Sequence, residues 1–192
     1  MPSLAVLYDP ESGQWQRFDK LVEEIEVHAL DKVIPTIDYL DKRVEEEGLY
    51  AAGFVSYEAA AAFDEALQTR NQDDFPLLRF GLFASLEVMQ LPAQEQTLEP
   101  LTWQAQETAE EFSAKIDKIR AAIARGETYQ VNLTFPLYAE FTGDPWQLFL
   151  QLARGQYASG AGFLQSDRWA ICSVSSELFF ARHDDQLTMR PM

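Results

Sequence analysis

Two short segments of this 192-residue chain carry side chains whose types and spacing could do chemistry. The first places the uncharged hydrogen-bonding residues Gln130, Asn132 and Thr134 at every second position. Because successive side chains of a β-strand point to opposite faces, a strand here would present all three on one face. Such a row could bind a polar substrate or simply face solvent, and the spacing is compatible with both.

The second segment sets one carboxylate between serines and an apolar run. Glu177 follows Ser175 and Ser176 and precedes the sequence Leu-Phe-Phe. A carboxylate next to an apolar strand can have a raised pKa and act as a general acid. The alternative is an ordinary loop glutamate between two strands. We take Glu177 as the candidate catalytic acid.

The sequence lacks the residue patterns of a catalytic triad, a zinc site or a phosphate loop. The two histidines, His28 and His183, fall in a predicted helix start and a predicted turn, so a nucleophile–base triad is not expected. Cysteine and histidine do not cluster as zinc ligands, and the nine glycines form no phosphate loop. The single cysteine, Cys172, lies in an alternating run and is interpreted as a small buried hydrophobe.

The composition favours a folded, acidic protein. Hydrophobic residues make up 47% of the chain, which is enough to bury a core. With 31 acidic residues against 15 Lys plus Arg, the formal charge is -16, which disfavours binding to nucleic acid or to an anionic membrane. No apolar run approaches the roughly 20 residues of a membrane span, and the N-terminus has no leader pattern. We therefore expect a soluble cytoplasmic protein.

Periodicity and turn signals predict the elements in order. The first half is expected to contain a hairpin of strands 4–8 and 14–18, a helix over 28–47, a strand of the sheet core over 49–57, and a strand over 77–89. Pro35 lies either in the first turn of that helix or at a bend, and Gly48 ends it.

In the second half, Thr108 and Glu111 form a capping box for a helix that ends at Gly126. A strand over 129–141 follows, and Asp144 with Pro145 starts another helix. Four short strands are expected over 162–165, 169–174, 178–182 and 186–190. Strands dominate without strict alternation with helices, which favours an α+β fold in one domain.

Three segments, in order, resemble motifs of the chorismate-utilising enzymes. In chain order they are Gly53–Ala60 followed by Phe63 and Asp64, then Gly126–Thr134, and then Ser175–Phe179 with Ser176 where the family usually has Pro. The Asn-Leu-Thr ending of Gly126–Thr134 is more similar to the branch that forms 4-amino-4-deoxychorismate than to the anthranilate branch. The anthranilate branch and a non-catalytic partner-binding module remain the alternatives.

The resemblance implies a partial antiparallel β-sandwich flanked by helices. Residues 1–192 would be the N-terminal portion of a single chorismate-binding domain, without its catalytic C-terminal half. The family's motif over Thr188–Met192 normally continues with Lys-Gly-Thr, in which the lysine is the nucleophile. The 192 residues alone are therefore expected to be inactive, and their open strand edges to self-associate.

The resemblance also implies roles and partners. Chorismate would be aminated with ammonia from a glutamine amidotransferase subunit, on the route to 4-aminobenzoate and folate. Glu177 would protonate the departing ring hydroxyl, and Asn132 would hydrogen-bond the ring substituents with Gln130 and Thr134 as weaker companions. Mg²⁺ would neutralise a substrate carboxylate, and its ligands are expected in the C-terminal half rather than in this chain.

Overall fold

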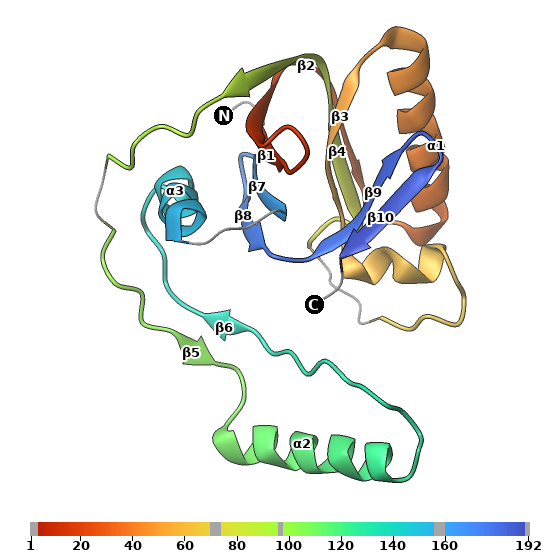
Figure 1. The fold of residues 1–192 in the computed structure, drawn as a ribbon, viewed down its shortest axis with the longest axis vertical. Helices are drawn as coiled ribbons and strands as arrows, with labels where there is room; N and C mark the ends of the chain where they lie inside the picture. The colour runs from red at the N-terminus through yellow and green to blue at the C-terminus, as the bar shows by residue number, and fades with distance from the viewer. Residues whose placement is uncertain (1–3, 70–73, 96–97, 156–159, 191–192) are drawn as a thin grey trace. The chain divides into compact units, whose positions relative to one another are not determined.

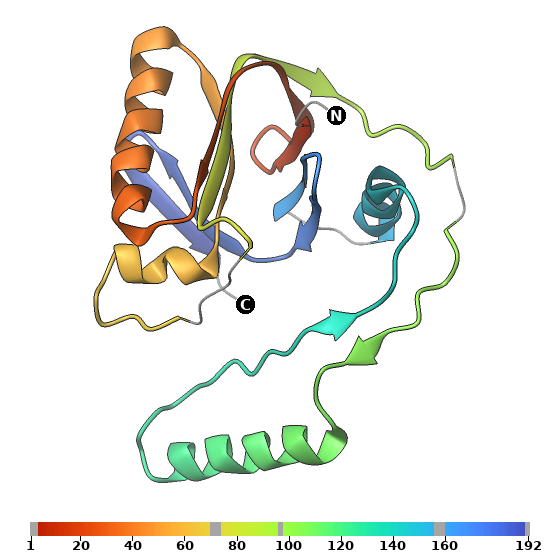
Figure 2. The ribbon, with the colours of Figure 1, turned by 180° about the vertical axis from the view of Figure 1, so that it is seen from behind.

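The computed structural model describes residues 4–69, 74–95, 98–155 and 160–190. The chain divides into two compact units, and each is described by itself. Unit 1 comprises Met1–Gln96 and Asp144–Met192, and unit 2 comprises Thr97–Gly143. Helices and antiparallel strands occur together, so the expected α+β class is confirmed (Figures 1 and 2).

Unit 1 is built on a six-stranded antiparallel sheet. Its strand order is β3-β4-β2-β1-β7-β8, in which β1 from the N-terminus lies between β2 and the much later β7 (Figure 1). The strands are β1 (Leu4–Asp9), β2 (Gln14–Val27), β3 (Tyr50–Val55), β4 (Leu78–Met89), β7 (Gly160–Gln165) and β8 (Ala170–Ser175). Segments from both ends of the chain therefore share one sheet.

The predicted hairpin at the N-terminus is confirmed. Asp9 closes the turn, because its carboxylate accepts the Ser12 hydroxyl at 2.6 Å and the Glu11 backbone N–H at 3.0 Å. The hydrogen bond from Ser12 lowers the pKa of Asp9 against the opposing effect of partial burial. Strand β2 continues well past the predicted end at Phe18, and a register shift between Leu21 and Glu23 lets it follow β4.

Strand β3 lies at an edge of the sheet, so the prediction that its segment occupies the core of a sheet was wrong. Its apolar composition suggested burial on both sides, but Tyr50 and Val55 are each 42% exposed. Gly53 allows β3 to approach β4 closely, because a Cβ at this position would overlap the carbonyl oxygen of Arg79.

Helix α1 (Leu30–Glu47) runs continuously through Pro35, so the helix does not begin at the proline. It ends at Gly48, whose φ of 65° is left-handed and whose N–H donates to Val44 O at 3.1 Å. Val33 and Leu40 of α1 pack with Leu78 and Leu82 of β4 in one core cluster. The short 3₁₀ helix η1 (Tyr57–Ala62) adds the fully buried Ala59 to the same cluster.

Helix α3 (Pro145–Gly155) starts where the Asp-Pro signal predicts. The Asp144 carboxylate accepts the Trp146 N–H at 3.0 Å, and Phe149 packs with Val6 and Phe163 in a second core cluster. Cys172 lies against this cluster, and burial together with the nearby Asp144 charge raises the pKa of its thiol to about 11. The interpretation of Cys172 as a small packed side chain is thereby supported.

Strands β9 (Leu178–His183) and β10 (Gln186–Arg190) form a separate two-stranded hairpin in unit 1, as predicted.

The side chains of His28 and His183 are 51% and 62% exposed, and each lies within 3 Å of a glutamate rather than a serine or cysteine. Neither histidine forms part of a nucleophile–base arrangement.

Unit 2 contains helix α2 (Ala109–Ala124) and the two-residue strands β5 (Gln104–Ala105) and β6 (Leu137–Tyr138). The capping box is present: Thr108 Oγ1 accepts the Glu111 N–H at 3.2 Å, and the Glu111 carboxylate accepts the Thr108 N–H at 2.9 Å. Among the described residues 98–143, none is buried.

The predicted strand over 129–141 was wrong except at Leu137–Tyr138. A strand is stabilised by the backbone ladder with its neighbour, and within the described part of unit 2 the paired neighbour is only the two-residue β5. Outside Leu137–Tyr138, the alternating sequence therefore forms no regular secondary structure.

Candidate active site

The first candidate segment begins at the end of helix α2. Gly126 has a φ of 74°, which ends the helix in the left-handed region. Across this glycine, the Arg125 guanidinium donates to both oxygens of Glu127, at 2.7 and 3.0 Å. This hydrogen-bonded pair lowers the pKa of Glu127 and raises that of Arg125. Sequence reasoning gave these two residues no role, although opposite charges on either side of a glycine were a usable signal.

Gln130, Asn132 and Thr134 follow on the extended segment, and all three are exposed. The Gln130 amide donates to Asn132 Oδ1 at 3.5 Å, so the structure brings these two side chains together. The alternate positions are also uncovered, since Tyr129 is 91% and Val131 45% exposed. Polar and apolar residues alternate along this segment, but neither set of side chains is buried.

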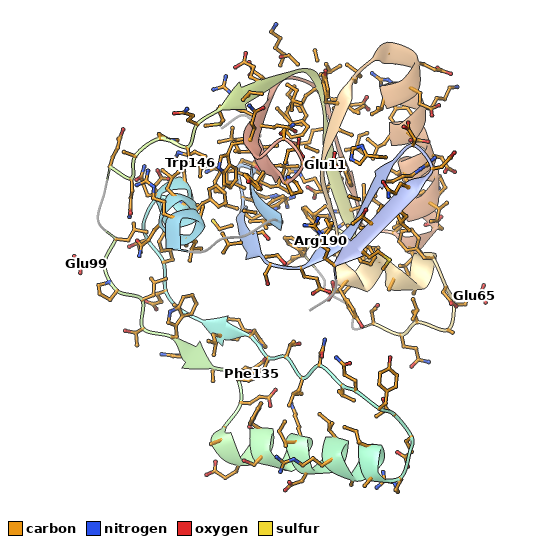
Figure 3. All side chains as sticks on the ribbon, in the orientation of Figure 1. Glu11, Glu65, Glu99, Phe135, Trp146 and Arg190 are labelled. Carbon is orange, nitrogen blue, oxygen red and sulfur yellow. The ribbon has the colours of Figure 1, made fainter. Side chains whose placement is uncertain are left out.

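An aromatic pair attaches this segment to helix α2. The rings of Phe112 and Phe135 meet edge to face with their centroids 5.6 Å apart, and Figure 3 labels Phe135 on the segment beside the helix. The contact holds the far end of the polar row against the first turns of α2. It leaves the polar side chains free of apolar cover.

Glu177 occupies the turn between β8 and β9, and its side chain is exposed. The turn is local: the Glu177 N–H donates to Ser175 Oγ at 3.1 Å, and that hydroxyl donates to Glu177 O at 3.3 Å. Gly160 permits a close approach, because a Cβ there would lie 3.0 Å from Glu177 O. Phe179 and Phe180, which suggested an apolar environment, are 78% and 55% exposed.

The predicted site residues are thus divided between the units. Glu177 belongs to unit 1, and Gln130, Asn132 and Thr134 belong to unit 2. Across the described ranges, no three His, Cys, Asp or Glu side chains gather as a metal site. No described helix is long and apolar enough to cross a membrane.

Comparison with known proteins identifies the family. The sequence profile described as "chorismate binding enzyme" matches residues 84–192, which include both candidate segments. Since this is more than half of the chain, the chain belongs to the chorismate binding enzyme family. The resemblance carried by the sequence motifs is confirmed.

The chain is also similar to individual bacterial proteins of two related names. Aminodeoxychorismate synthase component 1 of Escherichia coli is 34% identical over 109 residues, covering 57% of this chain and 24% of that protein. The Klebsiella aerogenes protein of the same name is 36% identical over 90 residues, covering 47% of this chain and 20% of that protein. Anthranilate synthase component 1 of Lactococcus lactis is 26% identical over 151 residues, covering 72% of this chain and 33% of that protein. The matches thus span a third or less of each relative's length.

Proposed function

We propose that this chain is part of an aminodeoxychorismate synthase component 1, which converts chorismate and ammonia into 4-amino-4-deoxychorismate and water. The observation that carries the proposal is the 34–36% identity to three bacterial proteins of that name. Both segments whose side chains suit the reaction lie inside the region that defines the family.

In this proposal Glu177 is the general acid. A lysine elsewhere in the domain forms a C–N bond to the ring as the ring C–O bond breaks, and the departing hydroxyl takes the Glu177 proton and leaves as water. Ammonia then displaces the lysine, and the proton that the new ammonium group loses restores Glu177. Hydroxide is a poor leaving group, so the proton from Glu177 lowers the barrier directly. Asn132 offers a neutral amide to the ring substituents, with Gln130 and Thr134 as weaker hydrogen-bonding companions.

The proposed site needs more protein surface than the described residues provide. Gln130, Asn132, Thr134 and Glu177 are all exposed, and unit 2 buries none of its described residues. A reaction that depends on a positioned proton donor requires a site that excludes water. We therefore propose that residues 1–192 form the N-terminal portion of one chorismate-binding domain, that other parts of it complete a β-sandwich and hold Mg²⁺, and that the chain alone has no turnover.

We propose a glutamine amidotransferase subunit as the ammonia source. If so, a complete enzyme containing this region uses ammonium directly, but uses glutamine only when that subunit is added. Product formation with glutamine in the absence of any amidotransferase would contradict this partner.

The experiment is a chimera. Residues 84–192 replace the matched segment of the Escherichia coli relative, and 4-aminobenzoate is measured with chorismate, ammonium, Mg²⁺ and a coupling lyase. We expect the chimera to be active and Glu177→Gln to lower kcat about a hundredfold or more, as for loss of a general acid. Glu110→Gln, an exposed glutamate in the first turn of α2, is the matched control and should retain full activity. An unchanged kcat in Glu177→Gln would refute the assigned role.

Anthranilate synthase is the second candidate, because the Lactococcus lactis protein matches over a larger share of this chain. Product identity separates the two, since anthranilate fluoresces directly whereas aminodeoxychorismate needs the lyase to release 4-aminobenzoate. A chimera that folds but forms neither product would instead favour a non-catalytic partner-binding module.

A further inference from the structure

Glu177 lies at the junction of two sheets of unit 1. Ser175 ends β8 and pairs with Gly160 of β7 in the six-stranded sheet. Leu178 begins β9, which pairs with β10 in the separate hairpin, and Figure 1 shows β8 continuing into β9 through a short connection. Only two residues, one of them Glu177, separate the two ladders. The backbone of this connection therefore decides where the Glu177 carboxyl points.

The Ser175 side chain holds the connection from the end of β8. Its Oγ accepts the Glu177 backbone N–H at 3.1 Å, and the same hydroxyl donates to the Glu177 carbonyl oxygen at 3.3 Å. A serine hydroxyl has one proton to donate and two lone pairs that accept, so it makes both hydrogen bonds at once. Both polar backbone atoms of Glu177 are thus tied to a residue that is itself fixed in the ladder of β8.

Gly160 approaches the connection from the neighbouring strand. A Cβ on Gly160 would lie 3.0 Å from the carbonyl oxygen of Glu177 and 3.2 Å from that of Ser175. These distances are tighter than ordinary van der Waals contact, so a side chain at position 160 would displace the turn by a few tenths of an ångström. The missing side chain lets the Glu177 carbonyl lie directly against β7.

The turn needs such restraint because little else in its sequence supplies it. Residue 176 is a serine, whereas a proline would fix φ at about −65°. Phe179 and Phe180 are 78% and 55% exposed, so these two rings give the turn no apolar cover. The Ser175 hydroxyl and the close approach of Gly160 therefore restrain the Glu177 backbone.

Restraint of the backbone bears on proton transfer. A general acid acts when its oxygen lies within about 2.6–3.2 Å of the oxygen that it protonates. Backbone conformation limits the rotamers that a side chain adopts, so a shift of the turn redirects the carboxyl. Misplacement of a reacting group by about 1 Å can lower a rate about a hundredfold. A residue that fixes the Glu177 backbone thus acts on the same step as the carboxyl itself.

We propose that Ser175 and Gly160 are positioning residues for Glu177, Ser175 through its hydroxyl and Gly160 through the absence of a side chain. Neither has to touch the substrate, because each acts through the carboxyl that donates the proton. The inference rests on the proposed role of Glu177 as the general acid. The restraint itself is measurable in the 192-residue chain, without any turnover.

The first measurement is amide hydrogen exchange by NMR on the full 192-residue chain. Ser175→Ala removes the hydroxyl and should speed exchange of the Glu177 N–H about fivefold, as for loss of one neutral hydrogen bond. Ser175→Thr keeps a hydroxyl and should exchange like wild type. Ser173→Ala, two residues earlier on the same face of β8, is the control and should leave Glu177 unchanged. Unchanged Glu177 exchange in folded Ser175→Ala overturns the restraint.

Gly160→Ala tests the second contact in the same chain. The added methyl group should displace the turn and move the Glu177 amide signal. Gly155→Ala, where an added Cβ meets no atom within 4 Å beyond its own helix, is the control and should leave that signal in place. An unmoved Glu177 signal in Gly160→Ala overturns the role of Gly160. This variant also decides the restraint if Ser175→Ala does not fold.

The second measurement uses the chimera with the Escherichia coli relative. Ser175→Ala should lower kcat about tenfold and leave the KM for chorismate unchanged, because the acid acts in the transition state. Ser175→Thr should retain kcat. An unchanged kcat in Ser175→Ala, or a raised KM with unchanged kcat, overturns the positioning role.

A double variant separates positioning from a general effect on the fold. In the Glu177→Gln background, Ser175→Ala should cause less than about a twofold further loss of kcat, since the acid that it positions is gone. Additive losses overturn the proposal. An inactive wild-type chimera refutes the synthase function and with it the catalytic role of these residues, whereas unchanged exchange in the 192-residue chain refutes the restraint alone.

Discussion

The sheet of unit 1 and helix α2 of unit 2 use the same kind of sequence with opposite results. Both carry regularly spaced apolar side chains, but every residue of the described chain that is buried lies in unit 1. On α2, Phe112 and Ile123 are 36% and 41% exposed, although they belong to one apolar stripe. Amphipathic spacing is a property of the sequence, whereas burial requires a partner surface.

The difference has an energetic consequence. Fully buried side chains such as Leu78, Leu82 and Phe149 each stabilise the fold by about 1.5–3 kcal/mol through burial. Helix α2 has no buried residue and depends on its capping box and local pairs. Isolated helices of about this length are marginal in water. Unit 2 should therefore be the less stable of the two, and four experiments examine that contrast.

The largest effect is expected in the core of unit 1. Leu82→Ala on β4 should lower the free energy of unfolding by about 3 kcal/mol, because Leu82 is completely buried and its removal leaves a cavity. Ile119→Ala, on the apolar stripe of α2, should change it by less than about 1 kcal/mol. Urea denaturation followed by tryptophan fluorescence measures both. Equal losses would show that α2 is buried in solution.

The next largest effect on stability is expected in the ion-pair network around Glu26. Burial alone would raise the pKa of Glu26, but hydrogen bonds from His28 and Arg168 and the charges of Arg168 and Arg79 outweigh it, so the pKa is lowered. A carboxyl whose pKa is lower in the folded state stabilises the fold above its ordinary pKa of 4.5 and loses that effect as pH falls through the folded value.

Accordingly, Glu26→Gln should lower the free energy of unfolding by about 1–2 kcal/mol at pH 7, with the difference from wild type shrinking in acid. Glu127→Gln removes an exposed pair in unit 2 and should give no measurable change at any pH. Denaturation curves between pH 3 and 7 are the measurement. A Glu26→Gln difference that is independent of pH would show that its charge does not contribute.

A smaller effect is expected at the start of α2. Thr108→Ala removes the capping hydroxyl that accepts the Glu111 N–H, and should destabilise the helix by about 1 kcal/mol. The result should appear as faster amide hydrogen exchange along α2, with exchange in β4 unchanged. Unchanged exchange along α2 would mean that the helix is stabilised mainly by packing rather than by its cap.

The smallest effect on stability is expected for the exposed stripe itself. Ile123→Gln should leave the free energy of unfolding within about 0.5 kcal/mol of wild type, because the side chain is 41% exposed. We propose that uncovered apolar surface on α2 adds to the self-association expected from open strand edges, so this variant should sediment as smaller species at high concentration. A wild-type chain that stays monomeric there would contradict the proposal.

The elements with local signals could be predicted from the sequence alone. The turn at Asp9, the capping box of Thr108 and Glu111, and the helix start at Pro145 each depend on residues a few positions apart. The strands after residue 160 were also anticipated, since short alternating runs are bounded by turn residues. Motif similarity placed the chain in its family for the same reason, because it compares residues and needs no contacts.

Tertiary structure alone decided which of these patterns found partners. The pairing of β1 with β7, the edge position of β3 and the burial of Arg79 beside Trp169 join residues far apart in the chain. The same limit explains the misprediction at 129–141, where the alternation is present but the described residues offer no neighbouring ladder of matching length. It also applies to Glu177, whose apolar neighbours in sequence are exposed in space. Sequence sets what each side chain can do, and the packing of distant segments decides whether it is covered.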